Sequence, residues 1–221
     1  MMMQRGEPWG TPAQGPADLT VDGDDAALAD VVAAHPGTRI RLASPSGSDV
    51  ARAVGLQTDT AEPQTEVAVD VIELSMDPGG DLVAVNAVVL GPAPDRLGRL
   101  QGRRPVVVEV DGRVAFDGRA TTVVIATGQY LRGNDLVPRG HPGDGRIEVQ
   151  VYALDAGQRR PMRERLPTGT HVPHPAIVEA SGTRVTVRAR AAWPLEIDGR
   201  RRKVTGSIDA VVRPAAYRLL V

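Results

Sequence analysis

Hydrophobic and polar residues alternate along much of the chain after residue 58. The clearest case is the segment 183–189, in which Val185 and Val187 share one face while Arg184 and Arg188 share the other. Because successive side chains of a strand point to opposite faces, this period of two predicts half-buried strands. We therefore expect far more strand than helix, with the two valines buried and the two arginines exposed.

Turn-forming residues separate these strands. Asp111-Gly112, between the apolar runs 106–110 and 114–116, is a strong signal for a hairpin. The remaining turn signals are Pro78-Gly79-Gly80, Ser181-Gly182 and Asp198-Gly199. The other runs expected as strands are 67–71, 82–90, 121–126, 147–152, 176–179, 183–189, 194–197 and 207–212. Many short strands divided by such turns predict an antiparallel β-sandwich.

The segment 18–57 has a different pattern, in which short apolar runs alternate with helical ones. The expected elements are strands 19–21 and 39–42 and helices 26–34 and 49–54. This order predicts a βαβα unit with parallel strands. Because two such short strands cannot form an independent sheet, we expect them to pack on the sandwich, on residues 215–221 or across a homodimer.

Composition narrows the class of protein. The 221 residues include no cysteine, which excludes disulfides, thiolate metal sites and a cysteine nucleophile. A formal net charge of −1 gives no electrostatic basis for nucleic-acid binding. No apolar run is long enough to span a membrane, and residues 1–16 lack the apolar core of a signal peptide. We therefore expect a cytoplasmic protein that does not bind nucleic acid, with residues 1–17 as a flexible leader.

Two loops stand where an α/β unit normally binds phosphate, at the ends of strands and the starts of helices. They are Gly23–Ala27 and Ser44–Asp49. Backbone amides in such loops can approach an anion, and their carboxylates can hold Mg²⁺. Alternatively, Asp25 and Asp49 only cap the helices that follow them, as Asp at such positions commonly does.

Longer stretches resemble a known family. VVIATGQYLRGNDLVPRGHPGDGRIEVQVY (123–152), LPTGTHVPHPAIVEASGTRVTVRARAAWPLEIDGR (166–200) and the ending VVRPAAYRLLV (211–221) are similar, in order and spacing, to diacylglycerol kinases, sphingosine kinases and related bacterial lipid kinases. In the first half, SPSGSDVARAVGL (44–56) resembles the family's PAGTGNDFARALGI. Residues 23–27 fall on the family's GGDGT nucleotide loop.

The resemblance implies a lipid-kinase and NAD-kinase-like fold, which is α+β and mostly β. It divides the chain, after the leader, into a remnant of an α/β nucleotide-binding domain at 18–58 and an antiparallel β-sandwich at 59–221. The last residues of the sandwich are expected to return to the first domain.

The resemblance also implies roles for individual residues. Asp198 would be the catalytic base that takes the proton of a lipid hydroxyl, although it is also the first residue of a hairpin turn. Asp144 remains from the family's metal pair, with Pro142 in place of another acid. The residues implied to bind nucleotide are Gly23, Asp25, Ser46, Gly47 and Asp49. An active member would use ATP and Mg²⁺, and an inactive one would need neither.

Several positions depart from the family pattern. Asp24 and Ala26 replace two glycines of the nucleotide loop, Pro45 replaces another glycine, and Arg200 replaces a metal-associated Glu. The first βαβ portion and a helical stretch between residues 90 and 106 are missing. These changes predict a catalytically impaired binding or regulatory module. The alternative is an active ATP-dependent kinase that phosphorylates a hydroxyl of diacylglycerol or a similar lipid.

A lipid or similar amphiphile is the expected partner, with peripheral contact to a membrane and a homodimer as further expectations. The basic run Arg200–Lys203 would meet anionic headgroups at roughly 1 kcal/mol per charge, or else it is a solvated hairpin tip. His171 and His174 have a spacing seen in zinc sites, but Pro173 lies between them and no third ligand is near. We expect His171 to pack its loop instead.

Overall fold

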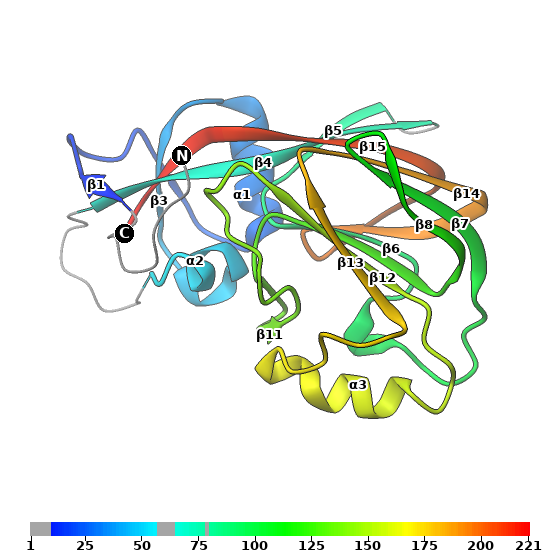
Figure 1. Ribbon diagram of the computed structural model, residues 1–221. Coiled ribbons are helices and arrows are strands. Elements are labelled where there is room, and N and C mark those ends of the chain that lie inside the picture. The colour runs from blue at the N-terminus through cyan, green and yellow to red at the C-terminus, as the bar shows by residue number, and fades with distance from the viewer. Residues whose placement is uncertain (1–9, 57–64, 78–79) are drawn as a thin grey trace.

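One continuous, strongly curled sheet runs through the molecule (Figure 1). The computed structural model describes residues 10–56, 65–77 and 80–221. The helices are α1 (Asp25–Ala34), α2 (Asp49–Ala53) and α3 (Arg159–Arg165), with short 3₁₀ turns η1 (Pro45–Gly47), η2 (Pro94–Arg96) and η3 (Leu166–Thr168). The strands are β1 (Thr11–Pro12), β2 (Leu19–Val21), β3 (Arg39–Leu42), β4 (Thr65–Asp77), β5 (Gly80–Ala84), β6 (Ala87–Leu90), β7 (Arg104–Val110), β8 (Arg113–Ala120), β9 (Thr122–Ala126), β10 (Tyr130–Leu131), β11 (Asn134–Asp135), β12 (Ile147–Tyr152), β13 (Ile177–Gly182), β14 (Arg184–Ile197) and β15 (Arg200–Leu220). The expectation of a mostly β, α+β fold is confirmed.

The βαβα unit forms as the local signals predict. Strands β2 and β3 pair in parallel. Helix α1 begins after Asp24, whose carboxylate accepts a hydrogen bond from the amide of Ala27 at 2.9 Å, a standard N-cap contact. Its apolar face buries Leu28 and Val32 against the strands. Helix α2 is capped in the same way by Ser48, whose side chain accepts from the amide of Ala51.

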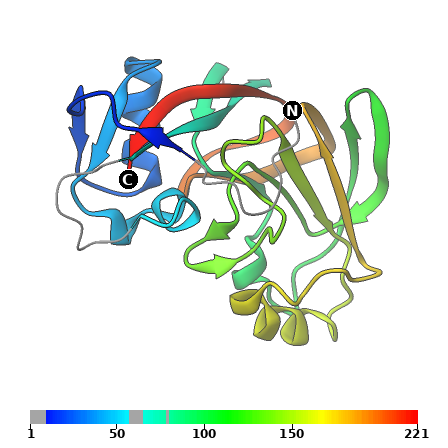
Figure 2. The ribbon, with the colours of Figure 1, turned by 60° about the vertical axis from the view of Figure 1, so that its left-hand side comes forward.

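The last strand joins this unit to the rest of the molecule. Near its C-terminal end β15 pairs in parallel with β3, with Arg218 opposite Arg39 and Leu219 opposite Ile40. The same stretch pairs antiparallel with β4 on its other side. Figure 2 shows this end of β15, in red, lying among the blue elements of the N-terminal unit. The short parallel strands are thus completed by the C-terminal segment, one of the three placements expected for them.

The sandwich is built from the remaining strands around a large apolar core. A second apolar cluster joins β6, β9 and β12 to helix α3. The predicted hairpin at Asp111-Gly112 forms between β7 and β8. Val185 and Val187 of β14 are fully buried in the large core, and Arg184 and Arg188 are exposed. The alternation read from the sequence is therefore confirmed. None of the helices that the structure describes is long and apolar enough to cross a membrane.

Strand β14 changes partner halfway along. Residues 185–189 pair with β7, whereas residues 195–197 pair with β6. Its pairing with β15 is irregular on both sides of Trp193. The chain between β6 and β7 forms a loop that contains η2.

Three sequence expectations differ from the structure. Ser181-Gly182 is not a hairpin turn, because both residues belong to β13, which pairs with β12, while β14 pairs with β7. The run 82–90 is broken into β5 and β6 at residues 85–86. Within the leader expected at 1–17, residues 11–12 form β1 and pair with β4. Residues 1–9, 57–64 and the turn residues 78–79 lie outside the described part of the chain.

Candidate active-site pocket

The junction between the N-terminal unit and the sandwich contains a pocket of about 450 Å³. It brings together residues from segments far apart in the sequence, and five of them are predicted site residues: Asp25, Ser46, Gly47, Asp49 and Asp198. The sixth, Gly23, lies close by, because its carbonyl oxygen is 3.8 Å from the position a Cβ would take on Gly47. Their roles in binding or catalysis stay predictions.

Asp25 begins helix α1 and points into the junction. One carboxylate oxygen accepts hydrogen bonds from the Ser48 hydroxyl and from the Val50 amide, the latter at 3.3 Å. The other accepts from the side-chain amide of Asn86 at 2.9 Å. The pKa of Asp25 is raised to about 6. Burial is the main cause and the nearby Asp49 carboxylate adds to it, while the hydrogen-bond donors act in the opposite direction. Asp25 therefore anchors α1 to α2 and to the sandwich.

Asp198 occupies the first position of the β14–β15 turn, with a φ of 48°. Its carboxylate is buried and accepts from three consecutive backbone amides, those of Val85 (2.8 Å), Asn86 (3.0 Å) and Ala87 (2.9 Å). These bonds hold the bend that separates β5 from β6, which explains why the run 82–90 is not one strand. Burial raises the pKa of Asp198 to about 7 despite the three donors, with Asp25 contributing.

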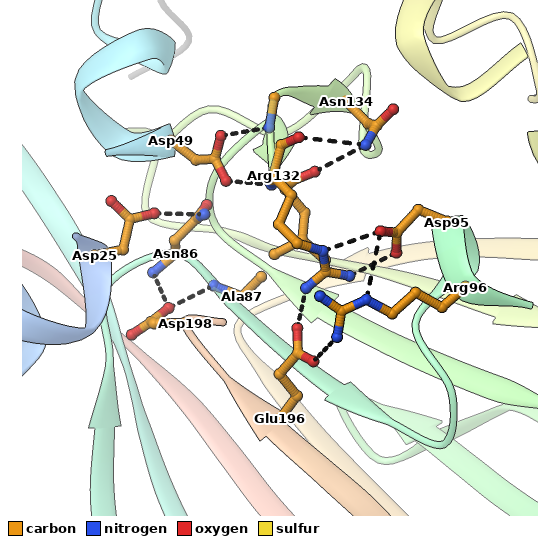
Figure 3. Close-up of polar contacts among 12 residues, drawn as sticks. Asp25, Asp49, Asn86, Ala87, Asp95, Arg96, Arg132, Asn134, Glu196 and Asp198 are labelled. Carbon is orange, nitrogen blue, oxygen red and sulfur yellow. Dashed lines mark hydrogen bonds and ion pairs between the residues drawn. The ribbon is translucent and has the colours of Figure 1, made fainter. Parts of the chain in front are cut away.

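Asn86 is a site residue that the sequence reasoning missed. Its side-chain nitrogen donates to Asp25, while its backbone amide donates to Asp198 (Figure 3). The same side-chain nitrogen also donates to the carbonyl of Tyr130 at 3.0 Å. Its side-chain oxygen faces Gly128, where a Cβ would lie only 2.1 Å away. The available signal was a single amide side chain inside an otherwise apolar run.

Asp49 holds a second turn against the pocket. Its carboxylate accepts from the backbone amides of Arg132 and Gly133, the latter at 2.8 Å. Both residues have positive φ, 51° and 74°, as a tight two-residue hairpin between β10 and β11 requires. Asp49 thus fixes the part of the sequence that matches the family's glycine-rich turn.

Arg132 extends from this turn into a network of ion pairs. Its guanidinium contacts Asp95, at 2.5 Å and 3.0 Å, and also Glu196. Arg96 lies 3.6 Å from the same Glu196 (Figure 3). Because two carboxylates already hold Arg132, its charge is largely neutralised and little of it remains for a ligand of the pocket.

The predicted metal residue, Asp144, does not line the pocket. It lies near Asp70, a buried carboxylate that accepts from the amides of Gly145 (2.7 Å) and Ala215 (2.8 Å). Among the residues that the structure describes, no group of three or more His, Asp or Glu side chains is placed to hold a metal ion.

Arg200, which replaces a metal-associated Glu of the family, turns toward helix α1. Its guanidinium lies 2.7 Å from Asp30 and 3.7 Å from Asp24. It is therefore paired with carboxylates while it stays exposed at the β14–β15 hairpin. His171 is buried and its ring stacks on Tyr152, with centroids 6.4 Å apart, consistent with a packing role.

The pocket residues do not fit Mg²⁺ or a triphosphate. The carboxylate oxygens of Asp25, Asp49 and Asp198, the three acids that remain from the family pattern, already accept hydrogen bonds from donors of the protein itself. Asp24 adds a carboxylate to the wall where phosphate would lie, and it would repel that phosphate.

Comparison with known proteins agrees with this architecture. The sequence model of the "YegS C-terminal NAD kinase beta sandwich-like domain" matches residues 97–221. No curated protein matches the sequence. Among solved structures, one described as a "putative diacylglycerol kinase" from Bacillus anthracis superposes with a TM-score of 0.73 at 14% identity, covering 92% of this chain and 78% of that one.

Two further structures show the same fold. A diacylglycerol kinase structure from Bacillus anthracis has a TM-score of 0.68 at 15% identity and covers 92% of this chain and 76% of that one. Yeast NADH kinase has a TM-score of 0.54 at 12% identity and covers 92% of this chain and 62% of that one. With the family match spanning more than half of the sequence, the chain belongs to the YegS and diacylglycerol-kinase-like family of lipid kinases.

Proposed function

We propose that this chain is a catalytically impaired member of its family that acts as a binding or regulatory module. The observation that carries the proposal is the use of the three surviving family acids. Asp25, Asp49 and Asp198 each accept hydrogen bonds from the protein's own amides or side chains, and together they tie the N-terminal unit to the sandwich. Their retention is then explained by folding, without a task in phosphoryl transfer.

The electrostatics of the pocket support the same proposal. Phosphoryl transfer depends on positioned metal ions and phosphate contacts. Four aspartates line the pocket, and of its two arginines Arg132 is held by Asp95 and Glu196. Pro45, which replaces a family glycine in the second loop, has no amide hydrogen to donate to phosphate. An anion therefore finds more repulsion than attraction there.

The alternative proposal is an active ATP-dependent kinase acting on a hydroxyl of diacylglycerol or a similar lipid. One observation favours it. The pKa of Asp198, raised to about 7, suits a general base at neutral pH. The lipid partner, the contact with a membrane surface and the homodimer expected from the sequence stay predictions under both proposals.

A turnover assay separates the two proposals. The purified chain is incubated with radiolabelled ATP, Mg²⁺ and mixed micelles containing diacylglycerol, and labelled lipid is measured. We expect no labelled lipid above the level given by Asp198→Asn. Asp144→Asn serves as a control acid outside the pocket. Turnover that is lost in Asp198→Asn and kept in Asp144→Asn would establish the active kinase.

A further inference from the structure

A second pocket, of about 500 Å³, lies on the sandwich where β14 changes partner. Its wall includes Gly91 and Pro92, just after β6, Gly102, just before β7, and Arg104, the first residue of β7. It shares no lining residue with the candidate active-site pocket, although Glu196, which lines it, contacts Arg132 of that pocket. The pocket is therefore a product of the switch in strand pairing and not an extension of the junction.

Arginine dominates the charge of this pocket. Among its lining residues there is a single carboxylate, that of Glu196, and there are four guanidinium groups, those of Arg96, Arg104, Arg201 and Arg202. The candidate active-site pocket has the opposite balance, with more carboxylates than guanidinium groups. An anion is therefore attracted to the sandwich pocket and not to the junction.

Two of these arginines have no carboxylate partner within the described part of the chain. Arg201 lies directly across the β14–β15 hairpin from Glu196, but Glu196 already contacts Arg132 and has Arg96 at 3.6 Å. Both residues pair with β14 through their backbones. Neither the Arg201 nor the Arg202 guanidinium makes a hydrogen bond or ion pair with any residue that the structure describes. Each guanidinium offers five donors in a planar fork, a geometry that matches phosphate.

The floor of the pocket is apolar. Trp193 and Leu195 line it and are almost fully buried, at 1% and 2% exposure. The indole N–H of Trp193 has no hydrogen-bond acceptor within the described part of the chain, which is uncommon for a buried Trp. A ligand that fits this pocket would have an anionic end for the arginines and an apolar part for the floor.

We propose that this pocket binds a phosphate monoester with an apolar portion, its phosphate held by Arg201 and Arg202 and its apolar part packed over Trp193. The inference goes beyond the proposed function, because it requires neither nucleotide nor catalysis and uses a different pocket. Such a monoester is either a soluble metabolite or the headgroup of a membrane lipid, and the test distinguishes these sources.

The chain itself supplies the reporter. It has two tryptophans, so Trp9→Phe leaves Trp193 as the single indole, and its fluorescence is followed during titration with octyl phosphate. Octyl glucoside is the uncharged amphiphile of the same chain length. We expect saturable binding of octyl phosphate only, weakened roughly tenfold by Arg201→Gln and by Arg202→Gln, since each change removes a charge-assisted hydrogen bond.

Arg200→Gln is the matched control, because Arg200 belongs to the same basic run but pairs with Asp30 and does not line the pocket. It should keep wild-type affinity. Equal weakening by all three substitutions, equal binding of octyl glucoside, or no binding of octyl phosphate would each overturn the proposal. Thermal unfolding midpoints close to wild type show that the variants are folded.

Competition identifies the source of the ligand. Displacement of octyl phosphate by inorganic phosphate, without displacement by vesicles of phosphatidylcholine and phosphatidic acid, assigns the site to soluble phosphate esters. Displacement by those vesicles, and not by vesicles of phosphatidylcholine alone, assigns it to a membrane lipid. Both results support the phosphate site. Vesicle binding that persists in Arg201→Gln and Arg202→Gln would contradict it.

Discussion

At the scale of single residues, the carboxylates of the junction act as acceptors that fix the backbone. Asp198 holds the bend between β5 and β6, Asp49 holds the β10–β11 turn, and Asp25 holds α2. Asn86 connects Asp25 with the sandwich through its side chain. A buried polar group that loses its partner costs about 1–3 kcal/mol, so these residues should matter for stability.

Asn86→Ala tests this role. The substitution removes the donor to Asp25 and to the Tyr130 carbonyl and leaves a buried carboxylate oxygen without that partner. We expect the free energy of unfolding in urea to fall by about 1–3 kcal/mol. Asn134→Ala is the control, because its side chain makes only long contacts of 3.4 Å within its own turn. An equal loss in both variants would contradict the role of Asn86.

The buried acids also make stability depend on pH. The folded-state pKa values of Asp25 and Asp198, about 6 and about 7, lie above the ordinary value of 3.8. The folded protein therefore holds more protons than the unfolded chain between these values. The contribution of the two groups to the free energy of unfolding is fully present below pH 3.8 and is lost as pH rises through 6 and 7.

Urea unfolding at about pH 5 and about pH 8 measures this dependence. Between these two pH values we expect the free energy of unfolding to fall more in wild type than in Asp198→Asn, which lacks one of the titrating groups. Asp25→Asn provides a second, independent comparison. Identical pH dependence in wild type and both variants would show that the two acids titrate normally.

The acids of the site were predictable and their partners were not. Asp25, Asp49 and Asp198 stand in stretches with recognisable spacing, so their positions in one pocket followed from the family resemblance. Asn86 and Arg132 act through contacts with residues far away in the sequence. No local pattern encodes such contacts, because they exist only once the sheet has closed.

At the scale of elements, local signals predicted those segments whose boundaries are set by their own residues. Helix α1 has its Asp24 cap and the β7–β8 hairpin has Asp111-Gly112. The prediction of a turn at Ser181-Gly182 was wrong, because pairing with β12 keeps both residues in β13. The sequence predicted only residues 207–212 of β15 as a strand. Pairing with β4 extends this strand past Pro214, with an irregularity between Arg213 and Tyr217.

Tyr217 fixes β15 to the N-terminal unit, because its ring is fully buried in the core shared by α1, β3 and β4. We expect Tyr217→Ala to lower the free energy of unfolding by about 3–5 kcal/mol, as for other large aromatic truncations. Tyr217→Phe should change it by less than about 1 kcal/mol, because the hydroxyl has no hydrogen-bond partner among the described residues. Chemical denaturation compares the two, and similar losses would show that the hydroxyl, not the ring, carries the effect.

At the scale of the whole molecule, two long strands join two apolar cores. β4 and β15 contribute to both the core of the N-terminal unit and that of the sandwich. The junction between the cores carries the family's acids in a pocket rich in carboxylates, while the pocket rich in arginines lies on the sandwich. The fold class could be predicted from the alternation of residues and the turn signals. The difference in charge between the two pockets could not, because it depends on which distant segments the fold brings together.

The central claim is that the acids of the junction stabilise the fold and do not serve a nucleotide. Calorimetric titration of Mg²⁺-ATP into the purified full chain tests it most directly. Two or three lost or repulsive contacts at ~1.5–3 kcal/mol each weaken a family-like affinity by several powers of ten. We therefore predict a dissociation constant in the millimolar range or weaker. Micromolar binding that is abolished by Asp25→Asn, in a variant that remains folded, would contradict the account.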